Sequence, residues 1–353
     1  MRFSLCTLGI IGAFGYHRKP NGQTVKTREL SDGIEKLASN CRILRADTSC
    51  WKSNPIGVYG SIRSLYKKSN KVLIALNRNG LRVVVPMLTR WSKNQNKELF
   101  FVVIGGWLPE FVAHSEARFH QMEQFSCIFV ETKAMYDSLS RAGLKNVSLL
   151  SNFKSFSYVP ELRFCSCKTV ELRTVFFSRV VKEKGVELAI EAIEKLGKTY
   201  SITLDIFGPV ADDYEKRFKA LVKNCSVVNY RGVLKPQSTE TYKILSQYDI
   251  MLFPTFYEGE GFPGALIDAY ISGLPVIASD WKYNSEIIVE GVTGWLVPPK
   301  DVHSLEVAIE NAIKNGDSLA KMRLNCVQEA KKYHVDNVLP KLLKEIGITI
   351  NTD

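Results

Sequence analysis

The feature of this sequence that most constrains its fold is an alternation of short, continuous apolar runs with segments of helical periodicity. In the segment EKGVELAIEAIEKL, for example, Val186, Ile190 and Ile193 share one face of a helix. Continuous apolar strands separated by helices are typical of parallel sheets with helices on both faces. The pattern therefore predicts an α/β fold.

The apolar runs form two series, separated by residues 151–173, which show no clean period and which we interpret as a linker. Expected strands of the first series lie near residues 2–8, 42–46, 72–75, 99–104, 126–130 and 147–150, and those of the second near 173–178, 202–207, 226–230, 250–254 and 275–279. The 353 residues suffice for two domains with separate cores. We expect Rossmann-like domains at 1–165 and 166–335, and a final helix within 336–353 that packs back toward the first domain.

Charge is distributed unevenly between the two series. Residues 1–160 contain 23 Lys and Arg against 10 Asp and Glu, whereas residues 161–353 contain 24 against 26. A strongly basic half favours an anionic ligand or surface, such as a membrane, although surface charge that serves solubility alone is the alternative. The basic residues do not alternate with aromatic side chains for base stacking, so nucleic acid is not an expected partner.

The eight cysteines are scattered without the spacing of a zinc site, and they favour a reduced, cytosolic compartment. The first residues, MRFSLCTLGIIGAFG, resemble a short signal sequence, but a strand followed by a glycine-rich loop explains them better. The longest apolar run, LFFVVIGGWLP, is about half of a membrane span. We expect a cytoplasmic protein without a membrane-spanning segment.

The densest chemical signal is the segment FPTFYEGEGFPGALIDAYISGLPVIASD, residues 253–280. An apolar strand ends at Pro254, and a helix begins near Pro263, since proline suits a first helical turn. Gly261 and Gly264 would let a ligand approach the backbone N–H groups at that helix start. The segment therefore predicts a phosphate-binding helix terminus.

Two carboxylates flank this expected phosphate site, Glu260 in the loop and Asp268 eight positions later in the helix. A carboxylate can accept two hydrogen bonds from vicinal hydroxyls, as a ribose or a sugar presents them. Two cations lie in a second segment, VFFSRVVKEKGVELAIEAI, where Arg179 follows an apolar strand and Lys184 precedes the next helix. Cations at those places can neutralise a diphosphate leaving group.

Taken together, the stretches SRVVKEKG, EGEGFPGALIDA, SGLPVIAS and EGVTGWLVPPKD resemble the carboxyl half of family-4 glycosyltransferases, over about residues 173–300. The resemblance implies the GT-B fold, with two facing Rossmann-like domains and an interdomain cleft, and transfer with retention of anomeric configuration. The family signature is a Glu, seven residues and a second Glu, and here Glu260 and Asp268 occupy those places. The implied catalytic residues are Glu260 on the transferred sugar and Arg179 and Lys184 on the diphosphate.

By the same resemblance, Asp268 would hold the ribose, and backbone groups of four consecutive residues would contact the donor, namely Gly261, Phe262, Pro263 and Gly264. The first half is similar only in general shape. Its loop GIIGAFGYHRKPNGQTVKTREL resembles the glycine-rich loop of the family, with Gly22 next to the donor phosphates, although an ordinary strand-to-helix turn is an equal alternative.

Two departures from the family pattern concern the donor sugar. Many relatives carry a His facing the sugar, and His114 in VIGGWLPEFVAH cannot be matched to it. The usual Gly-Gly-x-x-Glu turn is replaced by WKYNSE, residues 281–286, so the identity of the sugar stays open.

The sequence contains no Asp-x-Asp triplet of the kind that holds a metal in glycosyltransferases of the other common fold. We therefore expect metal-independent hexosyl transfer, without a cofactor, from a nucleoside diphosphate sugar such as a UDP-sugar. The expected acceptor is a polyprenyl-diphosphate-linked or oligosaccharide chain in surface polysaccharide synthesis, reached from the inner face of the cell membrane. Two alternatives stay open: a sugar-nucleotide epimerase or phosphorylase of the same fold, and a non-enzymatic basic binding module.

Overall fold

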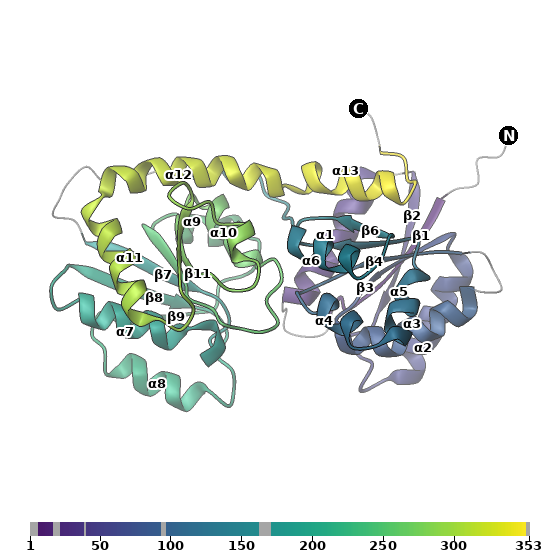
Figure 1. Cartoon of the computed structure of the whole chain (residues 1–353), viewed down its shortest axis with the longest axis horizontal. Coiled ribbons are helices and arrows are strands. Elements are labelled where there is room, and N and C mark those ends of the chain that lie inside the picture. Colours follow the sequence, from purple (N-terminus) through teal and green to yellow (C-terminus); the bar gives the residue numbers. More distant parts are fainter. Residues whose placement is uncertain (1–5, 17–21, 39, 93–96, 162–170, 351–353) are drawn as a thin grey trace. The chain divides into compact units, whose positions relative to one another are not determined.

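The computed structural model describes residues 6–16, 22–38, 40–92, 97–161 and 171–350. The chain divides into two compact units, the first formed by Met1–Ser155 with Val335–Asp353 and the second by Phe156–His334 (Figure 1). Each unit contains a six-stranded sheet, and its strands are parallel, as the apolar runs predict. The expected domain boundary between residues 165 and 166 lies outside the described residues.

The sheet of the first unit has the strand order β2-β1-β3-β4-β5-β6. Its strands are β1 (Cys6–Gly12), β2 (Cys41–Asp47), β3 (Lys71–Ala75), β4 (Glu98–Val102), β5 (Cys127–Val130) and β6 (Val147–Leu149). The chain passes from β1 to β2 on one side and then returns to β3 on the other side of β1. The carboxyl ends of β1 and β3 therefore form the topological switch point of this sheet.

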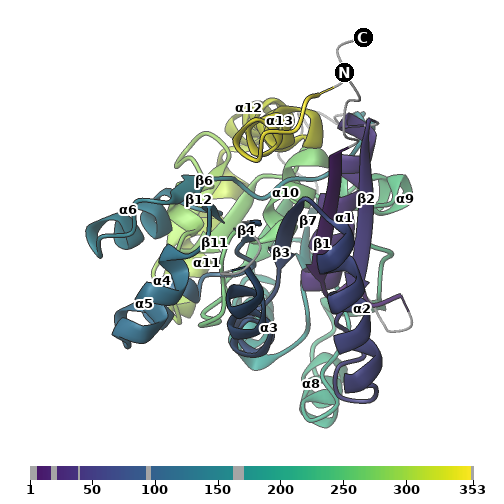
Figure 2. The same cartoon turned by 90° about the vertical axis from the view of Figure 1, so that its right-hand side faces the viewer.

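Helices cover both faces of the first sheet. They are α1 (Gly22–Leu37), α2 (Pro55–Lys68), α3 (Arg78–Ser92), α4 (Leu108–Ala113), α5 (Glu116–Glu123), α6 (Lys133–Arg141) and α13 (Val335–Glu345). One face packs against α1 and α13, and the Gly33 Cα lies so close to α13 that a Cβ there would be 2.6 Å from Leu339. In Figure 2, α13 lies above the strands of the first sheet, and α3, α4 and α5 lie below them.

The first strand differs from the prediction. We placed it at residues 2–8, followed by a glycine-rich loop, but β1 continues to Gly12. Ile10 and Ile11 are fully buried, and the glycines on either side of them, Gly9 and Gly12, lie in the strand itself. A Cβ on Gly9 would lie 2.3 Å from Leu65, and one on Gly12 would lie 2.6 Å from Thr27. These glycines therefore allow α1 and α2 to pack closely on the strand instead of forming a loop.

The sheet of the second unit has the order β12-β11-β10-β7-β8-β9. Its strands are β7 (Leu172–Phe177), β8 (Ile202–Phe207), β9 (Val228–Gly232), β10 (Ile250–Phe253), β11 (Val276–Ser279) and β12 (Gly294–Val297). The sequence analysis missed β12, because four residues that include a glycine and a half-buried Trp295 give little apolar signal. Here the chain leaves β7 toward β8 and returns to β10, so β7 and β10 flank the switch point.

The helices of the second unit also form two layers around the sheet. One face packs against α7 (Val186–Leu196), α8 (Glu215–Lys223) and α11 (Val302–Lys314), and the other against α9 (Thr239–Leu245), α10 (Gly264–Ile271) and α12 (Gly316–Ala330). Among all described helices, none combines the length and the apolar composition needed to span a bilayer.

Candidate nucleotide-sugar site

The predicted site residues of the second unit gather at the switch point between β7 and β10. In open parallel sheets, ligands bind beyond the carboxyl ends of the strands where the strand order reverses. The segment after β7 carries Arg179 and Lys184, and the segment after β10 carries Glu260 and the start of α10. Since β7 and β10 are neighbours in the sheet, the segments that follow them begin side by side at its carboxyl edge and then diverge.

The centre of the site is an ion pair between Lys184 and Glu260, residues that the sequence separates by 76 positions. Lys184 ends a short 3-10 helix, η1 (Lys182–Lys184), and only 7% of it is exposed. Glu260 is 6% exposed and also accepts a hydrogen bond of 3.4 Å from the hydroxyl of Thr255. The attraction within a buried ion pair barely offsets the cost of removing both charges from water, so the pair adds little net stability. Buried charged groups of this kind are typical of functional sites.

The segments after β7 and β10 are held together by backbone contacts around Gly185. This residue has φ +77°, in the left-handed region, and a Cβ there would lie 2.0 Å from the carbonyl oxygen of Pro254. Phe256 donates its N–H to the carbonyl of Glu183 at 2.8 Å. Only glycine meets both requirements. The close approach fixes the place where Lys184 meets the opposite segment.

Arg179 is exposed, and its guanidinium carbon lies 5.3 Å from the ring centroid of Tyr257. The Lys184 ammonium lies 5.1 Å from the same ring. Tyr257, which the sequence analysis did not single out, therefore contacts both predicted diphosphate-binding cations. Its backbone is fixed in turn, because the indole N–H of Trp281 donates to its carbonyl at 2.9 Å.

Helix α10 begins at Gly264, one residue later than Pro263, which occupies the N-cap position. No side chain caps this helix start, and its first backbone N–H groups are of the kind that bind anions. Gly261, Phe262 and Pro263 are buried directly before it. Asp268 lies within α10 and is only 6% exposed, so it is no ordinary solvated helix acid.

The segment 281–286, which departs from the family pattern, follows β11 and packs beside the site. Lys282 has a positive φ of 54° and pairs with Glu258 at 2.6 Å. Asn284 donates to the carbonyl of Ser279 at 2.9 Å. The ion pair connects this segment to the loop that carries Glu260.

Gly22 belongs to the first unit and is the exposed first residue of α1. The loop before it includes residues 17–21, which lie outside the described part. Before that gap, the segment after β1 is held by Asp47, whose carboxylate accepts hydrogen bonds from the N–H groups of Phe14 at 3.0 Å and Ser49 at 2.8 Å. Partial burial alone would raise the pKa of Asp47, but the hydrogen bonds from Ser49, Gly15 and Phe14 outweigh it and lower the pKa below its ordinary value.

Sequence reasoning missed a second buried ion pair, between Lys26 of α1 and Glu131, which directly follows β5. Glu131 also accepts a hydrogen bond from the Gly105 N–H at 3.1 Å. The missed signal is a charged residue directly after an apolar strand, the same signal that identified Arg179. His114, which we left unplaced, is an exposed residue at the end of α4, 3.8 Å from Glu110.

Within the described ranges, no group of three His, Cys, Asp or Glu is arranged to hold a metal ion. The cations of the site are side chains, Arg179 and Lys184. The arrangement of two cations, an uncapped helix start and two buried acids is suited chemically to a diphosphate that carries hydroxylated groups.

The two parallel-sheet units and this switch-point site define the class of fold as GT-B, as expected. The solved structures show the same fold over almost the whole chain. HepE of Anabaena, whose structure contains UDP, has a TM-score of 0.74 at 14% identity and covers 97% of this chain and 99% of its own. The sucrose-phosphate synthase of Thermosynechococcus elongatus has a TM-score of 0.74 at 16% identity and covers 96% and 98%.

At the level of sequence, residues 168–333 match the family model described as "Glycosyl transferases group 1". The amylovoran biosynthesis glycosyltransferase AmsK of Erwinia amylovora is 32% identical over 38% of this chain and 34% of its own length. The poly(ribitol-phosphate) alpha-N-acetylglucosaminyltransferase of Staphylococcus aureus is 29% identical over 61% and 43%. The matches thus span less than half of these relatives.

These matches confirm the predicted resemblance at the level of group 1 glycosyl transferases, and they agree with the predicted class of enzyme. The assignment to family 4 and the retention of configuration stay predictions. So do the roles of the individual site residues.

Proposed function

We propose that this protein is a retaining glycosyltransferase of polysaccharide synthesis, which moves a hexose from a nucleoside diphosphate sugar, in the simplest case a UDP-sugar. The observation that carries the proposal is the buried Lys184–Glu260 pair at the switch point, beside the uncapped start of α10. A fold that supports many reactions does not by itself define one, so the proposal depends on this site. Support also comes from the group 1 match, which covers the site residues of the second unit.

In the proposed reaction, the bond between the anomeric carbon and the diphosphate breaks, and an acceptor hydroxyl forms the new bond on the same face of the sugar. Negative charge develops on the leaving diphosphate, where Arg179, Lys184 and the first N–H groups of α10 stabilise it. The departing phosphate oxygen takes the proton of the acceptor hydroxyl. Glu260 would orient the sugar hydroxyls and Asp268 the ribose, and Gly22 would contribute backbone N–H groups from the first unit. Fixed cations supply the charge that a metal would otherwise supply.

The proposed acceptor is a lipid-linked or oligosaccharide chain, and the proposed location is the inner face of an anionic membrane. The end of α2 supports this location. Lys67 and Lys68 are exposed there, and Ile56 and Tyr59 on the same helix are 85% and 45% exposed. Exposed apolar side chains near the start of a helix and basic ones at its end suit the surface of an anionic bilayer. Lys71, which sequence reasoning would group with them, lies in β3 and pairs with Glu98.

The test of the function is a thermal-shift screen of the full chain against nucleoside diphosphate sugars, followed by transfer assays with the stabilising donor. A specific donor raises the unfolding midpoint by mass action. Transfer should persist in excess EDTA, and the product should keep the anomeric configuration of the donor. Release of free sugar or of an isomerised donor without any acceptor would instead identify a hydrolase or an epimerase. Activity that disappears with EDTA and returns with magnesium or manganese would overturn the metal-independent site.

A further inference from the structure

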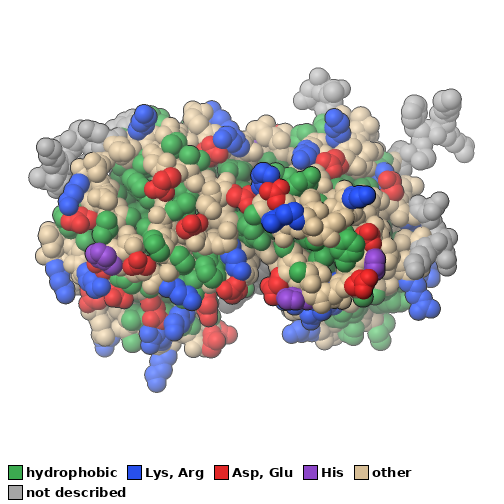
Figure 3. All heavy atoms as spheres, viewed as in Figure 1, with side chains coloured by type: hydrophobic (Ala, Val, Ile, Leu, Met, Phe, Trp, Pro, Cys, Tyr) green, Lys and Arg blue, Asp and Glu red, His purple; other side chains and the backbone are tan. Residues whose placement is uncertain are grey.

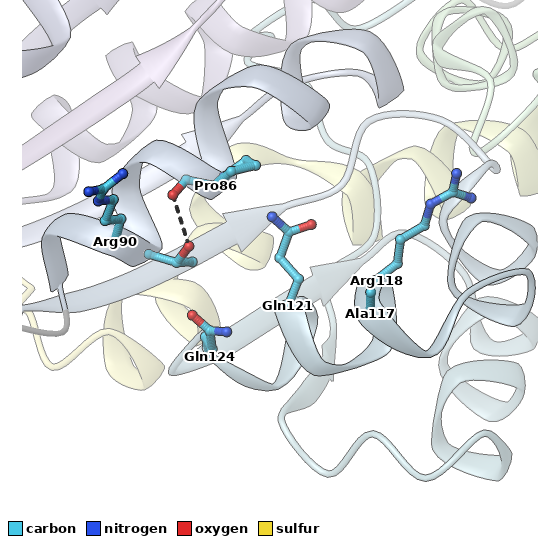
Figure 4. A pocket seen from close by; sticks show the side chains of 7 residues that line it. Pro86, Arg90, Ala117, Arg118, Gln121 and Gln124 are labelled. Carbon is cyan, nitrogen blue, oxygen red and sulfur yellow. Dashed lines mark hydrogen bonds between the residues drawn. The ribbon is translucent and has the colours of Figure 1, made fainter.

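A shallow cleft between α3 and α5 in the first unit lies apart from the switch points of the sheets. Its volume is about 450 Å³, within the range of small-ligand sites. It is lined by Pro86, Thr89 and Arg90 from α3 and by Ala117, Arg118, Gln121 and Gln124 from α5 and its end. In Figure 4, the amide of Gln121 lies between Arg90 and Arg118 in the plane of the view.

On the α3 side of the cleft, the charged lining residue is Arg90. Arg78 and Arg82 lie nearer the start of the same helix, which contains no acidic residue. Within the described residues, none of these arginines forms a salt bridge.

The α5 side keeps its acids away from the cleft. Glu116 and Glu123 both contact His120, at 3.7 Å and 2.7 Å, on the stripe next to the one that lines the cleft. Arg118 is held by the carbonyl of Phe111 at 3.3 Å and stacks on that ring, with its guanidinium carbon 4.4 Å from the ring centroid. A stacked guanidinium loses little freedom when it binds an anion. Among the residues that the structure describes, no acid lines the cleft.

We propose that this cleft binds a phosphate-bearing carbohydrate. Guanidinium groups recognise phosphate oxygens in a bidentate manner, and primary amides donate to and accept from sugar hydroxyls. Two arginines and two glutamines in one cleft match both parts of such a ligand. That the ligand is part of the acceptor chain rests on the proposed function, whereas the binding itself does not. The guanidinium and amide groups of the cleft fit a soluble or a lipid-linked sugar phosphate, and attachment to a bilayer surface is an alternative outcome of the test.

The test is an NMR titration of the full chain with glucose 6-phosphate, with inorganic phosphate and glucose as partial probes. Arg90→Gln and Arg118→Gln should each weaken glucose 6-phosphate binding about tenfold, as expected for a lost charged hydrogen bond. Gln121→Ala should weaken glucose 6-phosphate but not inorganic phosphate. The matched control is Arg42→Gln, an exposed arginine on β2 of the same unit, which should change nothing.

Binding of UDP to the same variants separates this proposal from the proposed function, because the donor site should be unaffected in all of them. Binding of the same variants to vesicles that contain phosphatidylglycerol tests whether the cleft binds a lipid headgroup. Glucose 6-phosphate affinity that survives both arginine variants would overturn the proposal. So would a protein that binds the vesicles through Arg90 but not the sugar phosphate, since the cleft would then be part of a membrane surface. Arg90 is exposed, so its variant should fold even if that of Arg118 does not.

Discussion

At the scale of single residues, the Lys184–Glu260 pair should behave differently from an exposed pair. Because both side chains are buried, Lys184→Met leaves an uncompensated carboxylate and should lower the free energy of unfolding by about 3–5 kcal/mol. Glu260→Gln should cost a similar amount, whereas the double variant should recover most of the loss. Denaturant unfolding measures all three.

Lys184 and Glu260 are both largely shielded from solvent, so the pair should affect stability as well as turnover. Losses of the two single variants that simply add in the double variant would show that the pair does not interact. Turnover should fall about 100-fold or more in all three variants, because Lys184→Met removes a charge that stabilises the leaving group and Glu260→Gln removes a carboxylate that orients the sugar hydroxyls.

The lowered pKa of Asp47 makes the stability of the fold depend on pH. Its folded pKa lies below the ordinary value of 3.8, so its contribution to stability is fully present above about pH 4 and is lost as pH falls through the folded pKa. Asp47→Asn should therefore lower the free energy of unfolding by about 1–3 kcal/mol at pH 7, with a smaller difference at pH 3. Asp32→Asn, on an exposed acid of α1, is the control. A pH-independent difference would contradict the assignment to the carboxylate.

At the scale of elements, the contact between the segments after β7 and β10 depends on Gly185. Gly185→Ala should strain the backbone at φ +77° and push Pro254 away, and it should both destabilise the protein and weaken donor binding. Gly316→Ala, at the open start of α12, has no atom within 4 Å of its new Cβ and serves as control. Unfolding midpoints and UDP affinity measure the two effects. Wild-type UDP affinity in Gly185→Ala would show that this contact does not shape the site.

The same elements show how far sequence reasoning reaches. Five of the six strand positions in the second unit could be predicted because buried parallel strands are continuous apolar runs, and Lys184 and Glu260 could be placed in the loops that follow such runs. Their pairing could not, since it depends on β7 and β10 being neighbours across 76 residues of chain. The extent of β1 was missed because glycine marks both loops and close helix packing. Tyr257 was missed because its contacts are formed only in three dimensions.

At the scale of the whole molecule, the basic residues of the first half predict salt-dependent attraction to anionic membranes. On the face drawn in Figure 3, however, Lys and Arg side chains are interspersed with acidic and apolar ones, so no single patch is evident on that side. Lys67→Glu with Lys68→Glu should lower binding to anionic liposomes, since each basic residue near the surface contributes about 1 kcal/mol. Binding should also weaken as the salt concentration rises.

The control for the liposome test is a reversal in the second unit, Lys219→Glu with Lys223→Glu, on the helix α8. It should leave binding unchanged. Equal loss in the two double variants would mean that the attraction comes from net charge and not from the end of α2.

The central claim is that the switch point of the second unit binds the diphosphate of a nucleotide sugar. Calorimetric titration of UDP into the full chain tests it most directly, with Arg179→Ala compared with Lys182→Ala, an exposed cation three residues away in the same segment. The account predicts one UDP per chain, at least a tenfold loss of affinity in Arg179→Ala with an unchanged unfolding midpoint, and wild-type affinity in Lys182→Ala. No UDP binding, or equal affinity in Arg179→Ala and the wild type, would contradict it.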